Sequence, residues 1–133
     1  MIDFAAILKA NPSGVFASSD GNKVKTRVFG HLFTEGNKVY FSTNNEKAVY
    51  KQMQANPNVS FCTYTQDFNP VLSVNGKAVF VEDMALKQRA FEASPALKSI
   101  YNSPENPIFK IFYIDVEEVV TFTFAEGTKT YKV

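Results

Sequence analysis

The 133-residue sequence contains no tryptophan, one histidine and one cysteine, and these shortages exclude several kinds of site. A lone cysteine, Cys62, cannot form a disulfide within the chain. Metal ligands are equally scarce, and no HExxH or GxSxG spacing occurs, so we predict no metal site and no conventional hydrolase. We expect Cys62 to be structural and His31 to be a hydrogen-bonded residue at the surface or an interface.

The sequence also lacks an excess of charge and a long apolar run. Its 14 basic and 13 acidic residues leave a net charge of +1, with no basic stripe, which argues against a nucleic-acid partner. No stretch approaches the roughly 18 apolar residues of a membrane span, and the first residues lack the features of a secretory signal. We therefore expect a cytoplasmic protein that does not bind membranes.

What is present indicates one compact domain over residues 1–133, since 45% of the residues are hydrophobic and no linker interrupts them. Periodicity predicts a short helix at 3–10 capped by Asp3, a helix capped by Asn44 or Asn45 and ended by Asn56-Pro57, and two further short helices at 84–91 and 96–101. The strands are predicted at 13–19, 23–33, 38–43, 59–65, 71–83, 109–124 and 128–133. Asp20-Gly21 predicts a turn between the first two strands, and Gly76 indicates a bend or a close backbone approach. This order predicts an α+β fold, an antiparallel six- to seven-stranded split β-barrel with short peripheral helices.

The predicted strand 23–33 has two distinct faces, because successive side chains of a strand point in opposite directions. One face is assigned to the barrel interior and consists of Val24, Thr26, Val28, Gly30 and Leu32. The other face is assigned to the outside and consists of Lys25, Arg27, Phe29, His31 and Phe33. An outer face that mixes charges with large aromatics predicts a symmetric homodimer.

Two features predict an anion site. Only Arg27 and Arg89 among the basic residues are arginines, and a guanidinium grips a phosphate in two places. The segment Ser42–Lys47 places two hydroxyls at a strand end, followed by a helix N-terminus with a lysine in its first turn. An ordinary surface charge and an ordinary helix cap would explain each feature alone. We expect the intervening hairpin to bring the Arg27 strand beside the strand that ends at Thr43.

Five segments together resemble a known family. They are Thr26-Arg27-Val28-Phe29, Val39 to Asn44, Lys47, Gln52 to Val59, and Val74 to Ala78. In this order they resemble the FMN-binding split barrels related to pyridoxamine 5'-phosphate oxidase. The resemblance covers about residues 13–82 with motifs and the remainder by the order of strands and helices.

The resemblance implies a cofactor and its ligands. In that family the arginine and the lysine at these positions bind the FMN phosphate, which implies Arg27 and Lys47 here. Ser42, Thr43 and Asn44 would join them, and the backbone of Val28 and Phe29 would run along the flavin. Two protomers usually form each site, so a homodimer is implied again.

The sequence departs from the oxidase that names the family, because it has no tryptophan and no arginine after Arg89. We therefore predict an FMN-dependent oxidoreductase that uses NADH or NADPH to reduce a small molecule, and not one that oxidises pyridoxamine phosphate. One alternative is a noncatalytic flavin carrier or sensor. Another is a β-barrel module that binds haem or a partner through an aromatic face made of Phe29, Phe33, Tyr40 and Phe41.

Overall fold

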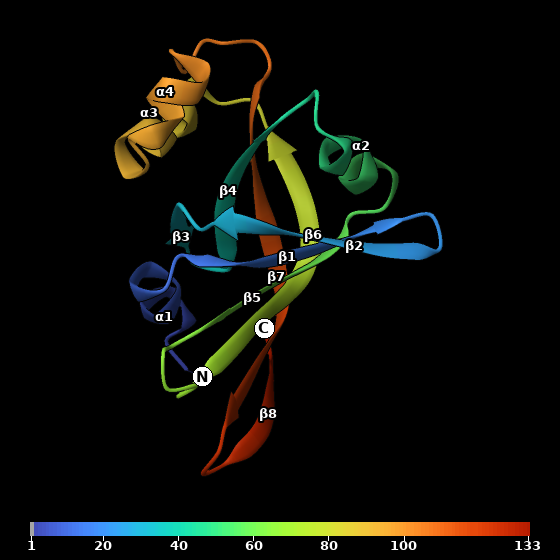
Figure 1. Cartoon of the computed structure of the whole chain (residues 1–133), viewed down its shortest axis with the longest axis vertical. Coiled ribbons are helices and arrows are strands. Elements are labelled where there is room, and N and C mark those ends of the chain that lie inside the picture. Colours follow the sequence, from blue (N-terminus) through green and yellow to red (C-terminus); the bar gives the residue numbers. More distant parts are fainter. Residues whose placement is uncertain (1) are drawn as a thin grey trace.

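A computed structural model describes residues 2–133, which form an eight-stranded antiparallel sheet with four short helices (Figure 1). The strands are β1 (Ser13–Asp20), β2 (Lys23–Gly30), β3 (Phe33–Glu35), β4 (Lys38–Asn44), β5 (Asn58–Tyr64), β6 (Val71–Val81), β7 (Phe109–Thr123) and β8 (Gly127–Lys132). The helices are α1 (Phe4–Ala10), α2 (Ala48–Ala55), α3 (Met84–Ala93) and α4 (Ala96–Tyr101). The strand order is β2-β1-β5-β6-β7-β4-β3, and β8 pairs with the C-terminal part of β7.

The sheet curls around an aromatic core. Phe16, Phe41, Phe61 and Phe112 are fully buried and pack together across the interior, with Phe16 and Phe41 ring centroids 5.5 Å apart. Each buried ring contributes about 1.5–3 kcal/mol of transfer free energy. A second buried cluster lies under α3 and α4, where Tyr101 packs on Phe109. Helices α3 and α4 therefore cover a second buried cluster, which is separate from the core enclosed by the sheet.

The predicted α+β class is confirmed, but the sheet has eight strands where six or seven were expected. The additional strand arises because the expected strand 23–33 divides after Gly30. The His31 N–H donates to the Pro12 carbonyl at 2.7 Å and the Leu32 N–H donates to the Tyr40 carbonyl at 3.0 Å. The backbone therefore exchanges its β1 partner for β4, and β3 begins as a separate strand.

Several local predictions are confirmed. Asp3 caps α1 by accepting from the Ala6 N–H at 3.2 Å, α4 forms at the expected residues 96–101, and α3 starts at Met84 as expected but runs two residues further, to Ala93. Gly76 lies at a register shift of β6, where an added Cβ would collide with the Asp115 carbonyl oxygen. A glycine is required there because β7 approaches too closely for a side chain.

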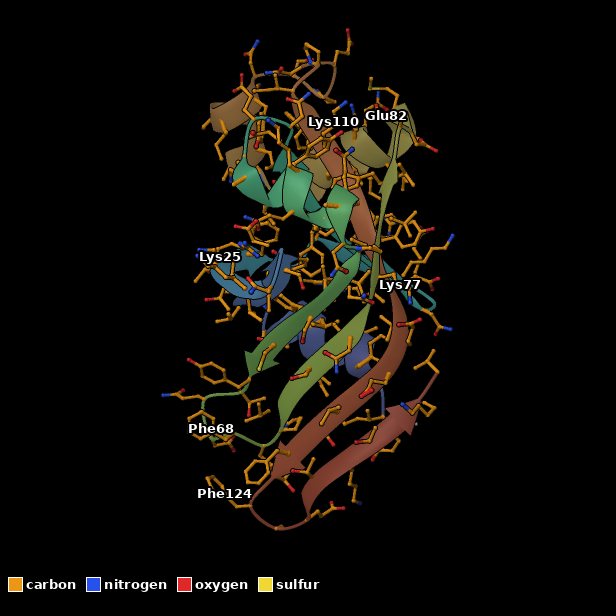
Figure 2. The ribbon with its side chains drawn as sticks, turned by 90° about the vertical axis from the view of Figure 1, so that its right-hand side faces the viewer. Lys25, Phe68, Lys77, Glu82, Lys110 and Phe124 are labelled. Carbon is orange, nitrogen blue, oxygen red and sulfur yellow. The ribbon has the colours of Figure 1, made fainter. Side chains whose placement is uncertain are left out.

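The predicted facing of β2 is wrong. Val24 and Val28, assigned to the interior, are each 73% exposed, whereas Phe29 packs against the core and His31 and Phe33 are buried. The reason is that β1 pairs with β2 so that Arg27 lies opposite the fully buried Phe16, which puts the Arg27 face inside. Lys25, on the same face, remains exposed because it lies toward the hairpin turn (Figure 2).

The expected pairing of the Arg27 strand with the strand of Thr43 is also wrong. β4 pairs with β3 and β7, while β2 pairs only with β1 among the described strands. The two strands instead meet across the barrel interior, where the Phe29 and Phe41 ring centroids are 6.1 Å apart.

None of the helices within residues 2–133 has the length and apolar character needed to cross a membrane.

Candidate functional site

The Arg27 guanidinium is held between three elements. Its Nη1 donates to the Ser18 hydroxyl at 2.9 Å and to the Phe16 carbonyl at 3.2 Å, both in β1. Its Nη2 donates to Oε1 of Gln52, in α2, at 3.1 Å. The side chain therefore reaches from β2 over β1 to the helix, and its position is defined by three hydrogen bonds.

All three acceptors are neutral. Among residues 2–133 no carboxylate forms an ion pair with Arg27, although six other ion pairs occur in the same part of the chain. Partial burial lowers the pKa of Arg27, because the charged form loses hydration. An arginine remains charged at neutral pH, so this site holds a positive charge that no neighbouring acid compensates.

The N-terminus of α2 differs from the prediction. The cap residue is Lys47, whose side chain makes no capping hydrogen bond, and the helix starts at Ala48. Asn44 does not cap the helix: its Oδ1 accepts from the Glu46 N–H at 3.0 Å and its Nδ2 donates to the Tyr101 hydroxyl at 3.0 Å. The first N–H groups of α2 therefore have no side-chain acceptor, which leaves the positive end of the helix available to an anion.

The two hydroxyls before α2 lie in different surroundings. Thr43 is 2% exposed, and its Oγ1 has no hydrogen-bond partner among the described residues. A buried hydroxyl without a partner costs about 1–3 kcal/mol, so such an atom calls for an explanation. Ser42 is half-buried, and Lys47 is exposed.

The structure brings Arg27 and the start of α2 into one neighbourhood through Gln52, which is four residues after Ala48 and so about 6 Å along the helix axis. Gln52 also lines a cleft of about 520 Å³ between α2 and the β1–β2 turn, together with Ala48, Lys51 and Asp20. Sequence reasoning did not select Gln52 as a site residue. No local signal marks it, because its role depends on β1 and β2 packing against the helix.

Val28 and Phe29 lie on opposite faces of an edge strand. Phe29 stacks on Phe16 with ring centroids 4.8 Å apart, whereas Val28 faces outward. No described strand pairs with the outer edge of β2, so the backbone N–H and C=O groups that point to that edge are free of sheet partners, while those on the other edge pair with β1.

His31 is buried, not on an outer face as predicted. It is 8% exposed, and its Nε2 lies 2.7 Å from the Thr34 hydroxyl oxygen. Burial lowers the pKa of His31 to about 4, so the imidazole is neutral near pH 7. Cys62 is a partly exposed free cysteine in β5, and residues 2–133 contain no cluster of acidic, histidine and cysteine side chains suited to a metal.

The aromatic face expected for a haem or partner module does not exist as a surface. Phe33, Tyr40 and Phe41 are at most 8% exposed, and Phe41 belongs to the barrel core while Phe33 and Tyr40 belong to the cluster under α3. The four rings are divided between two cores because alternate residues of β4 point to opposite sides of the sheet.

Comparison with known proteins identifies the family. The family model described as pyridoxamine 5'-phosphate oxidase matches residues 3–123, and the chain therefore belongs to this family. No curated protein matches the sequence. A solved structure of a NimC/NimA family protein from Clostridium acetobutylicum is 27% identical, with a TM-score of 0.85, over 96% of this chain and 88% of that one.

Two more distant structures share the fold. A FAD-binding protein from Mesorhizobium loti is 18% identical, with a TM-score of 0.70, over 90% of this chain and 92% of that one. A heme binding protein from Mycobacterium smegmatis is 12% identical, with a TM-score of 0.77, over 95% of this chain but 55% of that longer one. At these identities the likeness concerns the architecture.

Proposed function

We propose that this protein binds FMN and acts as a flavin oxidoreductase that uses NADH or NADPH to reduce a small-molecule acceptor. The observation that carries the proposal is the Arg27 guanidinium, held by neutral acceptors of β1 and α2, with no carboxylate of residues 2–133 paired to its charge. Membership of the family and the FAD-binding relative support a flavin as the ligand.

The residues present fit a flavin phosphate. Arg27, the uncapped first turn of α2 and the exposed Lys47 offer positive charge and N–H donors, which a phosphate dianion prefers. The unpartnered Thr43 hydroxyl is a further polar group in the segment leading to α2. Ser42 and Asn44 are kept in the proposed site as the neighbours of Thr43, and the free edge of β2 at Val28 and Phe29 is proposed to receive the ring.

The side chains would bind and orient the cofactor and would not supply an acid or base. His31 is neutral and engaged with Thr34, so it is not a ready proton carrier. When bound, FMN supplies the hydride and electron transfer. Arg27 and Lys47 would hold its phosphate, and the edge of β2 would hold its ring in one orientation.

A flavin titration tests the binding part. The absorption spectrum of the freshly purified protein should show the flavin band, and a haem Soret band in its place would favour the haem-binding alternative. In fluorescence titrations FMN should bind much more tightly than riboflavin, because riboflavin lacks the phosphate. Equal affinities for the two ligands would refute the proposed phosphate site.

Anaerobic mixing tests the reaction. NADH or NADPH should bleach the flavin band of the FMN-loaded protein, because a nicotinamide can stack on an open flavin face without a second phosphate clamp. Pyridoxine 5'-phosphate should not bleach it, since the chain has no arginine after Arg89 to hold that substrate. If neither nicotinamide reduces the flavin, the carrier or sensor alternative becomes the better description.

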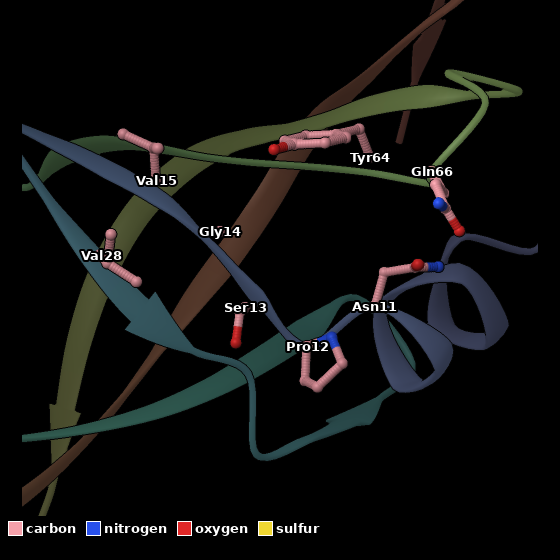
Figure 3. Close-up of a pocket in the computed structure, with 8 residues that line it drawn as sticks. All are labelled: Asn11, Pro12, Ser13, Gly14, Val15, Val28, Tyr64 and Gln66. Carbon is pink, nitrogen blue, oxygen red and sulfur yellow. The ribbon is translucent and has the colours of Figure 1, made fainter.

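We also propose a homodimer, on a different surface from the one first expected. The outer face of β1 and β2 exposes Val15, Val24 and Val28, and Tyr64 on β5 borders it. Figure 3 shows Val15 and Val28 on these neighbouring strands, beside a hollow of about 510 Å³ that extends to Tyr64. A second copy covering this face would remove three exposed valines from water and would lie next to the free edge of β2.

Light scattering checks the assembly. The wild type should have twice the mass of one chain, and Val28→Glu should lower it to one, because a carboxylate in an apolar interface loses its hydration. Lys25→Glu is the control on the opposite face of the same strand. A monomeric wild type that still binds flavin would eliminate a site shared between protomers.

A further inference from the structure

The residue that connects Arg27 to α2 is Gln52. Its Oε1 accepts from Arg27 Nη2 at 3.1 Å and from the Ser18 hydroxyl at 3.0 Å, and Arg27 Nη1 donates to the same Ser18 hydroxyl at 2.9 Å. The three side chains therefore form a closed ring of hydrogen bonds between β2, β1 and α2. Ser18 is 3% exposed, so one corner of the ring is enclosed by the protein.

Within residues 2–133, the ring provides no acceptor for the Gln52 amide N–H groups and no acidic partner for the Arg27 charge. Gln52 contributes only its carbonyl oxygen, and its Nε2 has no acceptor among residues 2–133. The same side chain lines the cleft of about 520 Å³ that runs along α2 from Ala48 to Asn56. Gln52 is thus the side chain that both fixes the guanidinium and borders the cleft along α2.

We propose that Gln52 is a positioning residue that presents Arg27 to an anion, with the flavin phosphate as that anion. The inference rests on the proposed function for the identity of the ligand, but not for the geometry of the ring. The essential property of Gln52 is that its side chain is neutral. Its amide oxygen holds the guanidinium in place without cancelling the positive charge of Arg27. A carboxylate at position 52 would hold Arg27 equally well and compete with the phosphate.

The matched variants are Gln52→Glu and Gln54→Glu. Both add one negative charge to α2, but Gln54 is exposed and takes no part in the ring. We expect Q52E to weaken FMN binding about ten- to a hundredfold and to change riboflavin binding less than twofold. Q54E should leave both affinities near the wild-type values. A uniform loss for both ligands in Q52E, or no loss for either, would overturn the inference.

A flavin-independent measurement separates this inference from the proposed function. The Arg27 Nε–Hε resonance is followed by NMR while inorganic phosphate is added to the wild type and both variants. We expect saturable shifts in the wild type and in Q54E, and none in Q52E. If phosphate shifts Arg27 while no flavin binds, the positioning role stands and the flavin assignment fails. No shift in the wild type, or the same shift in Q52E, would refute the positioning role. Gln52→Met, which removes the amide without adding charge, covers the case in which Q52E does not fold.

Discussion

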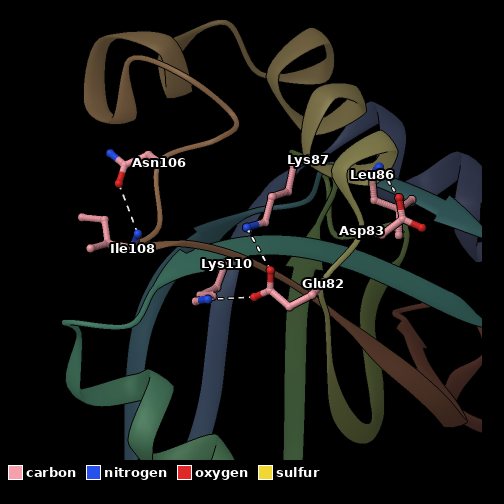
Figure 4. A network of polar contacts seen from close by, with 7 residues as sticks. All are labelled: Glu82, Asp83, Leu86, Lys87, Asn106, Ile108 and Lys110. Carbon is pink, nitrogen blue, oxygen red and sulfur yellow. Dashed lines mark hydrogen bonds and ion pairs between the residues drawn. The ribbon is translucent and has the colours of Figure 1, made fainter.

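Two sites in this protein hold basic side chains between strands and a helix. The positive charge is balanced by an acidic residue at one site but not at the other. At the first, Arg27 is surrounded by the neutral acceptors of Phe16, Ser18 and Gln52. At the second, Lys110 of β7 and Lys87 of α3 both pair with Glu82, at 2.7 and 3.2 Å (Figure 4).

The second group serves the fold. The Lys87 side chain is 7% exposed, and its ammonium group pairs with Glu82 while lying 6.0 Å from the Phe109 ring centroid. Its charge joins α3 to the end of β6, and Figure 2 shows Glu82 and Lys110 at the opposite end of the molecule from Phe68 and Phe124. Since a buried cation needs a partner for stability, the Arg27 group, which lacks an acid, is the one suited to an external anion.

The largest effect that we expect separates the two groups by ligand binding. Arg27→Ala should weaken FMN binding by about 1.5–3 kcal/mol, or roughly ten- to a hundredfold, because it removes charge-assisted contacts with the phosphate. Lys110→Gln should leave the affinity unchanged. Fluorescence titration measures both, and an equal loss in the two variants would show that the contrast between the groups is not functional.

The second expected effect concerns stability. Glu82→Gln should lower the free energy of unfolding by about 1–2 kcal/mol, because Lys87 would stay buried without an ion-pair partner. The loss should be smaller than for a fully buried pair because the Glu82 side chain is 65% exposed. Urea denaturation gives the value. The FMN affinity of the folded variant should match the wild type, and a parallel loss of affinity would contradict the separation.

The third prediction uses pH. The hydrogen bond from Lys110 is the main reason that the pKa of Glu82 lies below its ordinary value of 4.5. The folded state therefore binds this proton less readily than the unfolded chain, and the stabilisation is complete above that ordinary value and lost as pH falls below it. The stability difference between the wild type and Glu82→Gln, measured from pH 7 to pH 3, should shrink at the acid end. A constant difference would show that the ion pairs contribute nothing.

The smallest expected effect sharpens the description of the first group. Thr43→Val removes a buried hydroxyl that has no partner within residues 2–133, so the free energy of unfolding without ligand should stay the same or rise by up to about 1 kcal/mol. If this hydroxyl donates to the flavin phosphate, FMN affinity should fall about two- to tenfold. Thermal unfolding with and without FMN distinguishes the two results. A loss of stability without ligand would mean that the hydroxyl has a structural role.

Features that depend on a few neighbouring residues could be predicted from the sequence. Asp3 caps its helix, and the Asp20-Gly21 turn joins β1 to β2. Each results from local backbone chemistry, so the residues themselves contain the information. The family resemblance indicated by the Arg27 and Ser42–Lys47 segments was confirmed in the same way, because the motifs lie in short stretches.

Which face of β2 lies inside could not be predicted, because both faces alternate with the same period and each contains apolar residues. The choice depends on Phe16, Ser18 and Gln52, which come from other elements and make contact only when β1 and α2 pack around Arg27. The separation of β2 from β4 in the sheet depends likewise on β1 pairing with β5 and β4 with β7. Long-range packing therefore placed the guanidinium inside, and it turned Val28 toward water, where only a partner surface would cover it.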